Sequence, residues 1–419
     1  MRESTGYLEL LRIPSFDLFW LGRIVSGLGD MLFTMATMWY VLGLTHSPLA
    51  TAIIVLIPMI TFVLLGIPLA TVADRIPKKP TLIVTELARG VIIGIVWLLM
   101  EYHYIHSYEI YIANLLLSIG GFLFNPALQA AVPRIVREAN TQLVVANALL
   151  STTSQMIALL GYGLGGVIVL ILHPVNAVLI DAISFFISGC SFIPISIPRM
   201  KAPPSFGVRG FVKDSLEGIN AIWSMRMLRP LIIFASFINT LGAPMAVFTV
   251  VFSKFVLHAG VLGYGYLETA AALGGVVGAL VAGKVAWRLR LWQWMFISLG
   301  VSGLAIGSMP LIPYLATSMA LLAVVTLVLA LLNVPLGTSI QLAMPEEIRG
   351  RAMTSFALMV SGISSPIGLI VGGWLMGKIG PSSTFICVGA LALLGATTSL
   401  LIPGFRNVTE VEKRSSTSA

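Results

Sequence analysis

Long apolar stretches recur along the whole chain and are separated by short polar segments. Each stretch reaches about 20 residues, the length a helix needs to cross the hydrocarbon core of a bilayer. The first stretch does not resemble a cleaved signal peptide, because it is too long and no small-residue cleavage site closes it. The pattern predicts twelve membrane-spanning helices, at residues 16–44, 50–73, 80–100, 109–130, 145–172, 175–197, 230–252, 264–286, 291–310, 315–338, 354–377 and 382–402.

Composition agrees with a membrane protein. Of the 419 residues, 57% are hydrophobic and only 10% are charged, whereas a soluble domain has about 25% charged residues. The net charge of +8 could suggest nucleic acid, but the basic residues follow the predicted topology instead. If the N-terminus is cytoplasmic, nearly every Lys and Arg outside the spans lies on the cytoplasmic side, and only Lys254 and Lys378 lie opposite. The positive-inside rule therefore places both termini in the cytoplasm.

The predicted spans form two groups of six. The longest polar stretch between spans, 198–229, has apolar residues at helical spacing from Val212 to Met227. This spacing suits a helix on the inner leaflet or, equally, a helix packed on the protein's own cytoplasmic face. We expect four regions: a first six-helix half (1–197), a cytoplasmic linker (198–229), a second six-helix half (230–403) and a cytoplasmic tail (404–419).

Glycines indicate that the halves are repeats. Three glycines of span five recur in span eleven at a constant offset of 207 residues, from 161 to 368. Small residues allow helices to approach closely, and repeated halves around a central site are a common plan of transporters. The paired positions are Gly161, Gly165 and Gly166 with Gly368, Gly372 and Gly373.

The first span carries two charges, Arg23 and Asp30. A charge within a membrane span costs about 3 kcal/mol or more, so such a residue is a candidate for function. Seven residues separate the two, which puts them on one helix face but about 10 Å apart along the axis, too far to pair directly. We interpret Asp30 as a proton-binding group; the alternative is a structural carboxylate hydrogen-bonded to its neighbours.

Other spans carry charges as well. Glu86 and Arg89 are three residues apart in span three, where a structural ion pair is favoured over a direct substrate role. Asp181, in span six, is expected to have a structural hydrogen-bonding role. Glu268, near the outer end of span eight, is either a cavity residue or an interfacial one.

The loop after span two contains the most specific motif. It reads Ala-Thr-Val-Ala-Asp-Arg-Ile-Pro-Lys-Lys over residues 70–79 and resembles the signature loop of the major facilitator superfamily. The matching positions are Asp74, Arg75, Lys78 and Lys79, while Ala70 and Pro77 replace the usual glycines. The basic residues serve in any case to determine topology.

The resemblance implies that Asp74 contacts the cytoplasmic start of span eleven and holds a gate shut. The positive end of that helix would attract the carboxylate, and Arg349 and Arg351 add charge there. In the second half Trp287 stands at the acidic position, so we expect this latch in only one half.

A finer resemblance is to the drug:proton antiporter branch with bacterial macrolide efflux proteins and the enterobactin exporter. It covers nearly the whole chain, although Tyr162 stands where the export motif of span five has Pro. The resemblance implies an all-α membrane protein of two pseudo-symmetric six-helix bundles. The matching segments are Phe19-Trp20-Leu21-Gly22, Gly29-Asp30, Pro126-Ala127, Ala146-Asn147-Ala148, Asp181-Ala182-Ile183-Ser184-Phe185 and Arg349-Gly350-Arg351.

By this resemblance the protein exports amphipathic small molecules, such as macrolides, siderophores or lipids, in exchange for protons. It would work as a monomer in a bacterial cell membrane, with membrane lipid and substrate as its partners, no nucleic acid and no cofactor beyond the proton gradient. The alternatives are an uptake symporter or facilitator, and a membrane sensor that binds without transport. Polar residues on spans that line the cavity in this family are Asn125, Gln155, Asn239 and Asn333.

Enzyme chemistry and metal binding have no support in the sequence. No nucleophile–base arrangement, paired catalytic carboxylates or metal-ligand spacing occurs. The two cysteines, Cys190 and Cys387, lie inside predicted helices. All five histidines (His46, His103, His106, His173 and His258) fall at outer span ends or outer loops. There they could bind metal or sense external pH, although loops without Lys or Arg also simply tolerate His.

Overall fold

A computed structural model of the chain describes residues 10, 12–136, 140–196, 223, 225, 228–285, 288–342, 344, 353 and 355–401. All regular structure in these residues is helical, so the predicted all-α fold is confirmed. The elements are α2 (Pro14–Thr45), α3 (Pro48–Arg75), α4 (Lys78–Glu101), α5 (Ser107–Ile135), α6 (Asn140–Ser191), α8 (Leu228–Gly242), α9 (Met245–Phe255), α10 (Gly260–Val285), α11 (Leu291–Ser308), η2 (Met309–Leu311), α12 (Leu315–Leu342), η3 (Leu358–Ile363), α14 (Ser364–Ile379) and α15 (Pro381–Leu401).

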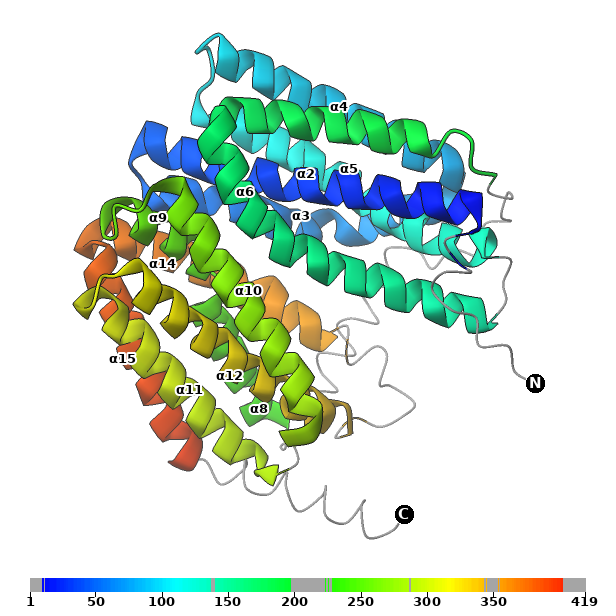
Figure 1. Ribbon diagram of the computed structural model, residues 1–419. Helices are drawn as coiled ribbons and strands as arrows, with labels where there is room; N and C mark the ends of the chain where they lie inside the picture. Colours follow the sequence, from blue (N-terminus) through cyan, green and yellow to red (C-terminus); the bar gives the residue numbers. More distant parts are fainter. Residues whose placement is uncertain are drawn as a thin grey trace, which may run out of the picture. The chain divides into compact units, whose positions relative to one another are not determined.

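Within the described residues, eleven helical segments are long and apolar enough to cross a membrane. One of them, α6, contains a non-helical residue, His173, followed by Pro174, and Figure 1 shows the chain reversing direction within this element. A proline lacks the N–H that would continue the helix and fixes its own φ, so α6 contains two spans. The structure thus agrees with the twelve predicted crossings of a multi-pass membrane protein.

The histidines have a specific place in these reversals. In the described residues every non-glycine residue with a positive φ is a histidine: His46 (50°), His103 (59°), His173 (64°) and His258 (51°). The left-handed region ends a helix, and histidine tolerates it better than most residues. His106, the fifth, precedes α5, and its backbone N–H donates to Glu109 Oε2 at 2.9 Å. Backbone geometry therefore offers a reason for the placement of four histidines at the chain reversals.

The chain divides into two compact units. The first comprises 1–46 and 57–209, and the second comprises 47–56 and 210–419. In this division the first part of α3 belongs to the second unit, and the boundary after residue 209 falls within the expected 198–229 linker. In the second unit, Gly373 of α14 packs on Leu49 and Ala52, and a Cβ at Gly373 would lie 3.1 Å from Leu49 Cα.

In the first unit, α2 packs on α6 and α5, and α4 packs on both α5 and α6. Aromatic side chains fill the core at one end of these helices. The ring centroids of Phe19 and Phe192 are 5.9 Å apart, and those of Phe124 and Phe192 are 6.0 Å apart. Phe16 joins them at 6.4 Å from Phe19, and all four side chains are buried. Burial of such large rings is a main source of core stability.

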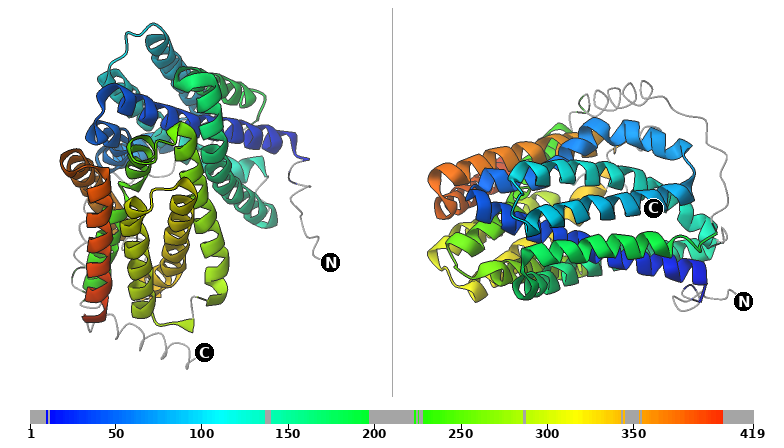
Figure 2. Two further views of the ribbon diagram at one scale, coloured as in Figure 1. Left: turned by 60° about the vertical axis from the view of Figure 1, so that its left-hand side comes forward. Right: turned by 90° about the horizontal axis from the view of Figure 1, so that it is seen from above.

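In the second unit, α10 packs on α12, and α11 lies between α12 and α15, as Figures 1 and 2 show. Glycines allow the closest approaches. A Cβ at Gly274 would overlap the Ala323 carbonyl oxygen, and one at Gly278 would lie 2.5 Å from the Leu327 carbonyl oxygen. Thr326 Oγ1 adds a hydrogen bond to the Ala271 carbonyl, at 2.6 Å.

The repeated glycines occupy equivalent places in the two units. Cβ atoms at Gly161 and Gly165 would press on Met31 and Met35 of α2. In the second unit, a Cβ at Gly368 would overlap the Thr240 carbonyl oxygen of α8, and one at Gly372 would press on Phe248 of α9 and on Pro244. Span five thus packs on span one as span eleven packs on span seven.

Candidate functional site

Asp30 forms an ion pair with an arginine of another span. Arg89 Nη2 of α4 lies 2.8 Å from Asp30 Oδ1 of α2. The Asp30 side chain is 32% exposed and that of Arg89 is 10% exposed. The pair therefore joins two spans of the first unit, and its acidic end is partly exposed.

Arg89 also contacts three residues besides Asp30. Its Nη1 lies 3.5 Å from Glu86 Oε1 on the same helix, in line with the pairing expected from their spacing. Its guanidinium stacks on the ring of Phe185 at 4.2 Å from the centroid, an attractive cation–π arrangement. The aliphatic part passes Gly120 of α5, where a Cβ would lie 3.2 Å from Arg89 Cδ. Packing on three sides thus fixes the guanidinium between carboxylates.

A third carboxyl group, that of Asp181 in α6, lies next to Gly29, the neighbour of Asp30 in the sequence. A Cβ at Gly29 would overlap Asp181 Oδ1 and Ser184 Oγ, so only glycine fits there without movement. The Asp181 side chain is fully buried, and it interacts electrostatically with Asp30, Arg89 and Glu86. We call Asp30, Glu86, Arg89 and Asp181 the charged cluster.

The sequence indicated each member of this cluster as a candidate, but it did not predict that the four side chains lie close together. It gave Asp181 a separate structural role and left the partner of Asp30 open. One signal was available: Gly29 next to Asp30 removes a side chain where another helix brings a carboxyl group. Arg23 does not join the contacts. The structure shows no ion pair between Arg23 and a described residue, although Arg23 interacts electrostatically with Glu86.

The uncharged polar candidates do not form a cluster within either unit. Asn125 and Gln155 are exposed in the first unit, and Asn333 is exposed in the second. Asn239 is half-buried, and its Nδ2 donates to the Ala235 carbonyl of its own helix at 2.9 Å, which is a local role.

Glu268 forms a hydrogen bond with one side chain of the second unit, that of Thr249. Its Oε1 lies 2.5 Å from Thr249 Oγ1 of α9. The same hydroxyl lies 3.0 Å from the carbonyls of Met245 and Ala246. The group is therefore tied to the helix-packing contact between α9 and α10, and it has no salt bridge to a described residue.

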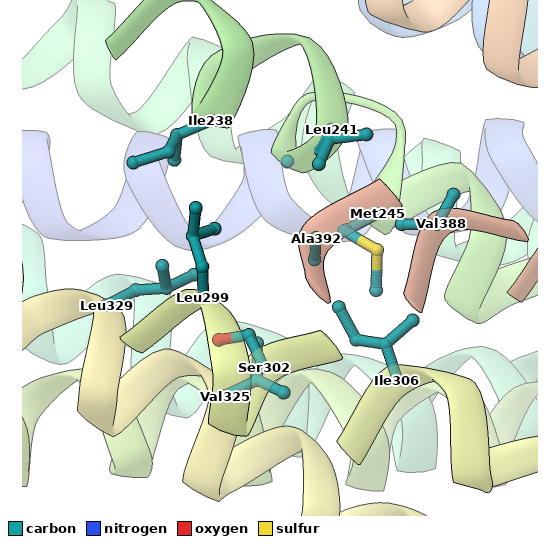
Figure 3. Close-up of a pocket in the computed structure, with 11 residues that line it drawn as sticks. Ile238, Leu241, Met245, Leu299, Ser302, Ile306, Val325, Leu329, Val388 and Ala392 are labelled. Carbon is teal, nitrogen blue, oxygen red and sulfur yellow. The ribbon is translucent and has the colours of Figure 1, made fainter. Parts of the chain in front are cut away.

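The second unit also contains a small apolar cavity beside the break between α8 and α9 (Figure 3). Its volume of about 40 Å³ has room for little more than a water-sized group, far below the roughly 300–1,000 Å³ of drug-sized sites. It is not a substrate site by itself. It is lined by Ile238, Leu241, Gly242, Met245, Leu299, Ser302, Ile306, Val325, Leu329, Val388 and Ala392.

The loop motif is only partly described. Lys78 Nζ donates to the Ala73 carbonyl at 2.6 Å and is buried, so it caps the end of α3. Arg75 is exposed and Lys79 is half-buried. The expected latch cannot be compared with the structure, because the described residues do not include the side chain of Asp74, Arg349 or Arg351. The described residues also exclude Trp287, most of the 198–229 linker and the 404–419 tail.

Metal binding was not expected from the sequence. Among the described residues, no group of three or more His, Cys, Asp or Glu side chains is placed to hold a metal ion. The charged cluster holds three carboxyl groups around a guanidinium, an arrangement suited to binding and releasing protons.

Comparison with known proteins establishes the family. The sequence profile described as Major Facilitator Superfamily matches residues 19–363 and 257–418. The chain belongs to the major facilitator superfamily. It is therefore a transporter, as predicted, and not an enzyme.

Similar curated proteins cover nearly the whole chain. The chain is 23% identical over 397 residues to "Multidrug efflux pump Tap" of Mycolicibacterium fortuitum, covering 92% of this chain and 95% of that one. It is 22% identical over 405 residues to "Macrolide efflux protein A" of Streptococcus pyogenes, covering 94% and 97%.

Solved structures agree on the fold. The nucleoside transporter NupG superposes with a TM-score of 0.73 at 13% identity, covering 92% of this chain and 98% of that one. A bacterial homologue of the human lysosomal transporter Spinster gives a TM-score of 0.71 at 14% identity, covering 95% and 98%. At such identities these structures support the transporter fold and nothing finer.

Proposed function

We propose that this transporter exports amphipathic small molecules, with macrolides and related drugs as the first candidates, in exchange for protons. The main support for the proposal is the ion pair between Asp30 and Arg89, which joins two spans and is partly exposed. The names of its relatives, a multidrug efflux pump and a macrolide efflux protein, support the substrate class and the direction.

The Asp30–Arg89 ion pair has the properties that coupling substrate transport to proton movement requires. With Asp30 ionised, the guanidinium neutralises it and α2 is held to α4. With Asp30 protonated, the attraction is lost and Arg89 is free to seek another partner. A proton taken up on one side of the membrane thus changes the contact between two spans, and alternating access converts this change into substrate movement.

The proposal includes the orientation and the surroundings of the transporter. The protein spans the plasma membrane of a bacterium with both termini in the cytoplasm, a topology that the basic loops support. The transporter acts as a monomer among membrane lipids, without nucleic acid and with the proton gradient as its only energy source. Asp74 closes the cytoplasmic side by contacting the start of span eleven near Arg349 and Arg351, so Asp74→Asn should reduce transport by weakening this latch.

Proteoliposomes with an imposed pH gradient test the function. Wild-type protein should drive a labelled macrolide against its gradient, in the direction opposite to proton flow, and Asp30→Asn should abolish this accumulation. Asp17→Asn is the matched control, because it makes the same change in the first turn of α2, away from the charged cluster. Accumulation that persists unchanged in Asp30→Asn contradicts proton coupling through Asp30. Movement of substrate together with protons favours an uptake symporter.

A further inference from the structure

Asp181 is, with Glu86, one of the two fully buried acids of the charged cluster. Its side chain is fully buried between α6 and the face of α2 at Gly29. Phe185, one turn further along α6, carries the stacked guanidinium of Arg89. Asp181 therefore lies on the same surface of α6 as the residue that stacks on Arg89, and it packs against Gly29, the neighbour of Asp30 in the sequence.

The hydrogen bonds around Asp181 do not suit a charged carboxylate. Its Oδ2 has no hydrogen-bond partner among the described residues. Its Oδ1 lies 3.2 Å from Ser184 Oγ, but that hydroxyl lies closer, 2.8 Å, to the Asp181 backbone carbonyl. A hydroxyl has one proton to donate. If it donates to the carbonyl, Asp181 must itself supply the proton between Oδ1 and Ser184.

The charges that face Asp181 lead to the same conclusion. From α2 the charged group is Asp30, and from α4 the charged groups are Glu86 and Arg89. Arg89 is already engaged by two carboxylates. An ionised carboxylate that is buried without a cation or hydrogen bonds costs several kcal/mol. A neutral acid at Asp181 avoids this cost and leaves Arg89 to Asp30.

We propose that Asp181 is a second proton-binding site, which exchanges its proton with Asp30 as Arg89 exchanges partners. In the conformation described, Asp181 is protonated and Asp30 is paired with Arg89. In the other state the proton moves from Asp181 to Asp30, the guanidinium turns to Asp181, and the charge of the cluster stays the same. The proton thereby passes between a buried group and a partly exposed one.

This inference rests on the proposed function for the biological role of Asp181. The experiment that tests it does not measure transport. The carbonyl stretch of a protonated carboxylic acid absorbs apart from that of a carboxylate and shifts in D₂O. Purified wild-type protein at neutral pH should show this band, and Asp181→Asn should remove part of its intensity. Asp17→Asn should leave the band unchanged, and Glu86→Gln and Glu268→Gln identify any contribution of those acids.

Removing the competing carboxylate tests the exchange itself. In Asp30→Asn the guanidinium lacks its first partner and should turn to Asp181, so the Asp181 band should disappear. Adding Arg89→Gln to Asp30→Asn removes the guanidinium and should restore the band. A purely structural hydrogen bond at Asp181 would not respond to either change.

The outcomes separate the two proposals. A band that is unchanged in Asp181→Asn overturns the second proton site, and a band that survives in Asp30→Asn overturns the exchange. Should Asp181→Asn fail to fold, Ser184→Ala should shift the frequency of the band, because Ser184 is the neighbour of Oδ1; an unshifted band is again contrary. If these spectra agree but proteoliposomes show no proton-driven transport, the site stands and the proposed function fails.

Discussion

The two units of the transporter share a helix plan but differ in the chemistry of their interiors. In the first unit, three carboxyl groups and a guanidinium meet where α2, α4 and α6 pack together. In the described part of the second unit, the interior holds one acid, which is bonded to a threonine, and a cavity lined almost entirely by apolar side chains. Repeats need not divide a task equally: here one unit concentrates charge that can respond to protons, and the other retains apolar packing.

Loss of Arg89 should give the largest effect, because this one cation serves several acids. Removing one partner of a buried charge pair typically costs about 3–5 kcal/mol. Arg89→Gln should therefore lower the midpoint of thermal unfolding in detergent markedly and abolish transport. Arg75→Gln, which changes an exposed arginine, should unfold like wild type. Equal stability of the two variants would show that the charged cluster is not held by its arginine.

A Gly→Ala substitution in each unit compares the helix packing of the two units. Gly274→Ala would place a methyl group against the backbone of α12, which cannot turn aside, so we expect about 1–3 kcal/mol of destabilisation. Gly29→Ala would meet the ends of the Asp181 and Ser184 side chains, which can rotate.

Gly29→Ala should consequently unfold nearer to wild type than Gly274→Ala, yet lose transport because Asp181 is displaced. Thermal unfolding and proteoliposome transport, measured on both variants, check this ranking. Normal transport by Gly29→Ala would separate Asp181 from the mechanism.

Glu268 should tolerate substitution better than the acids of the first unit. Glu268→Gln keeps a group able to bond Thr249 and removes no ion pair known among the described residues. We expect a change of about 1 kcal/mol or less in stability and an unchanged dependence of transport on the pH gradient. A loss of coupling as complete as in Asp30→Asn would mean that both units handle protons.

Two serines of α11 provide the smallest and most closely matched comparison. Ser302 Oγ is buried beside the apolar cavity without a partner among the described residues, whereas Ser298 Oγ donates to the Val328 carbonyl at 2.8 Å. Ser302→Ala should be neutral or slightly stabilising, and Ser298→Ala should cost about 1 kcal/mol. The midpoints of thermal unfolding of the two variants test this expectation. If Ser302→Ala is the less stable variant, Ser302 has a hydrogen-bonding partner at the cavity.

Sequence periodicity was sufficient for the spans, because a bilayer demands long apolar helices and few charges between their ends. It could also pair Glu86 with Arg89, since that pair lies on one helix. It could not bring Asp30 to Arg89 or Asp181 to Gly29, because these contacts depend on how three helices rotate about their axes. The rotation is set by side-chain packing such as that of Gly161 on Met31, which a single sequence does not display.

The histidines at the chain reversals have a practical consequence for every transport experiment described above. All five imidazoles are exposed, and the topology proposed above puts them on the outer side of the membrane, opposite to the basic loops. A histidine-directed reagent that cannot cross a bilayer would modify only those molecules whose reversals face the outside of a vesicle. The extent of labelling before and after the vesicle is opened would count the two insertion directions, so that an observed flux can be attributed to export or to uptake.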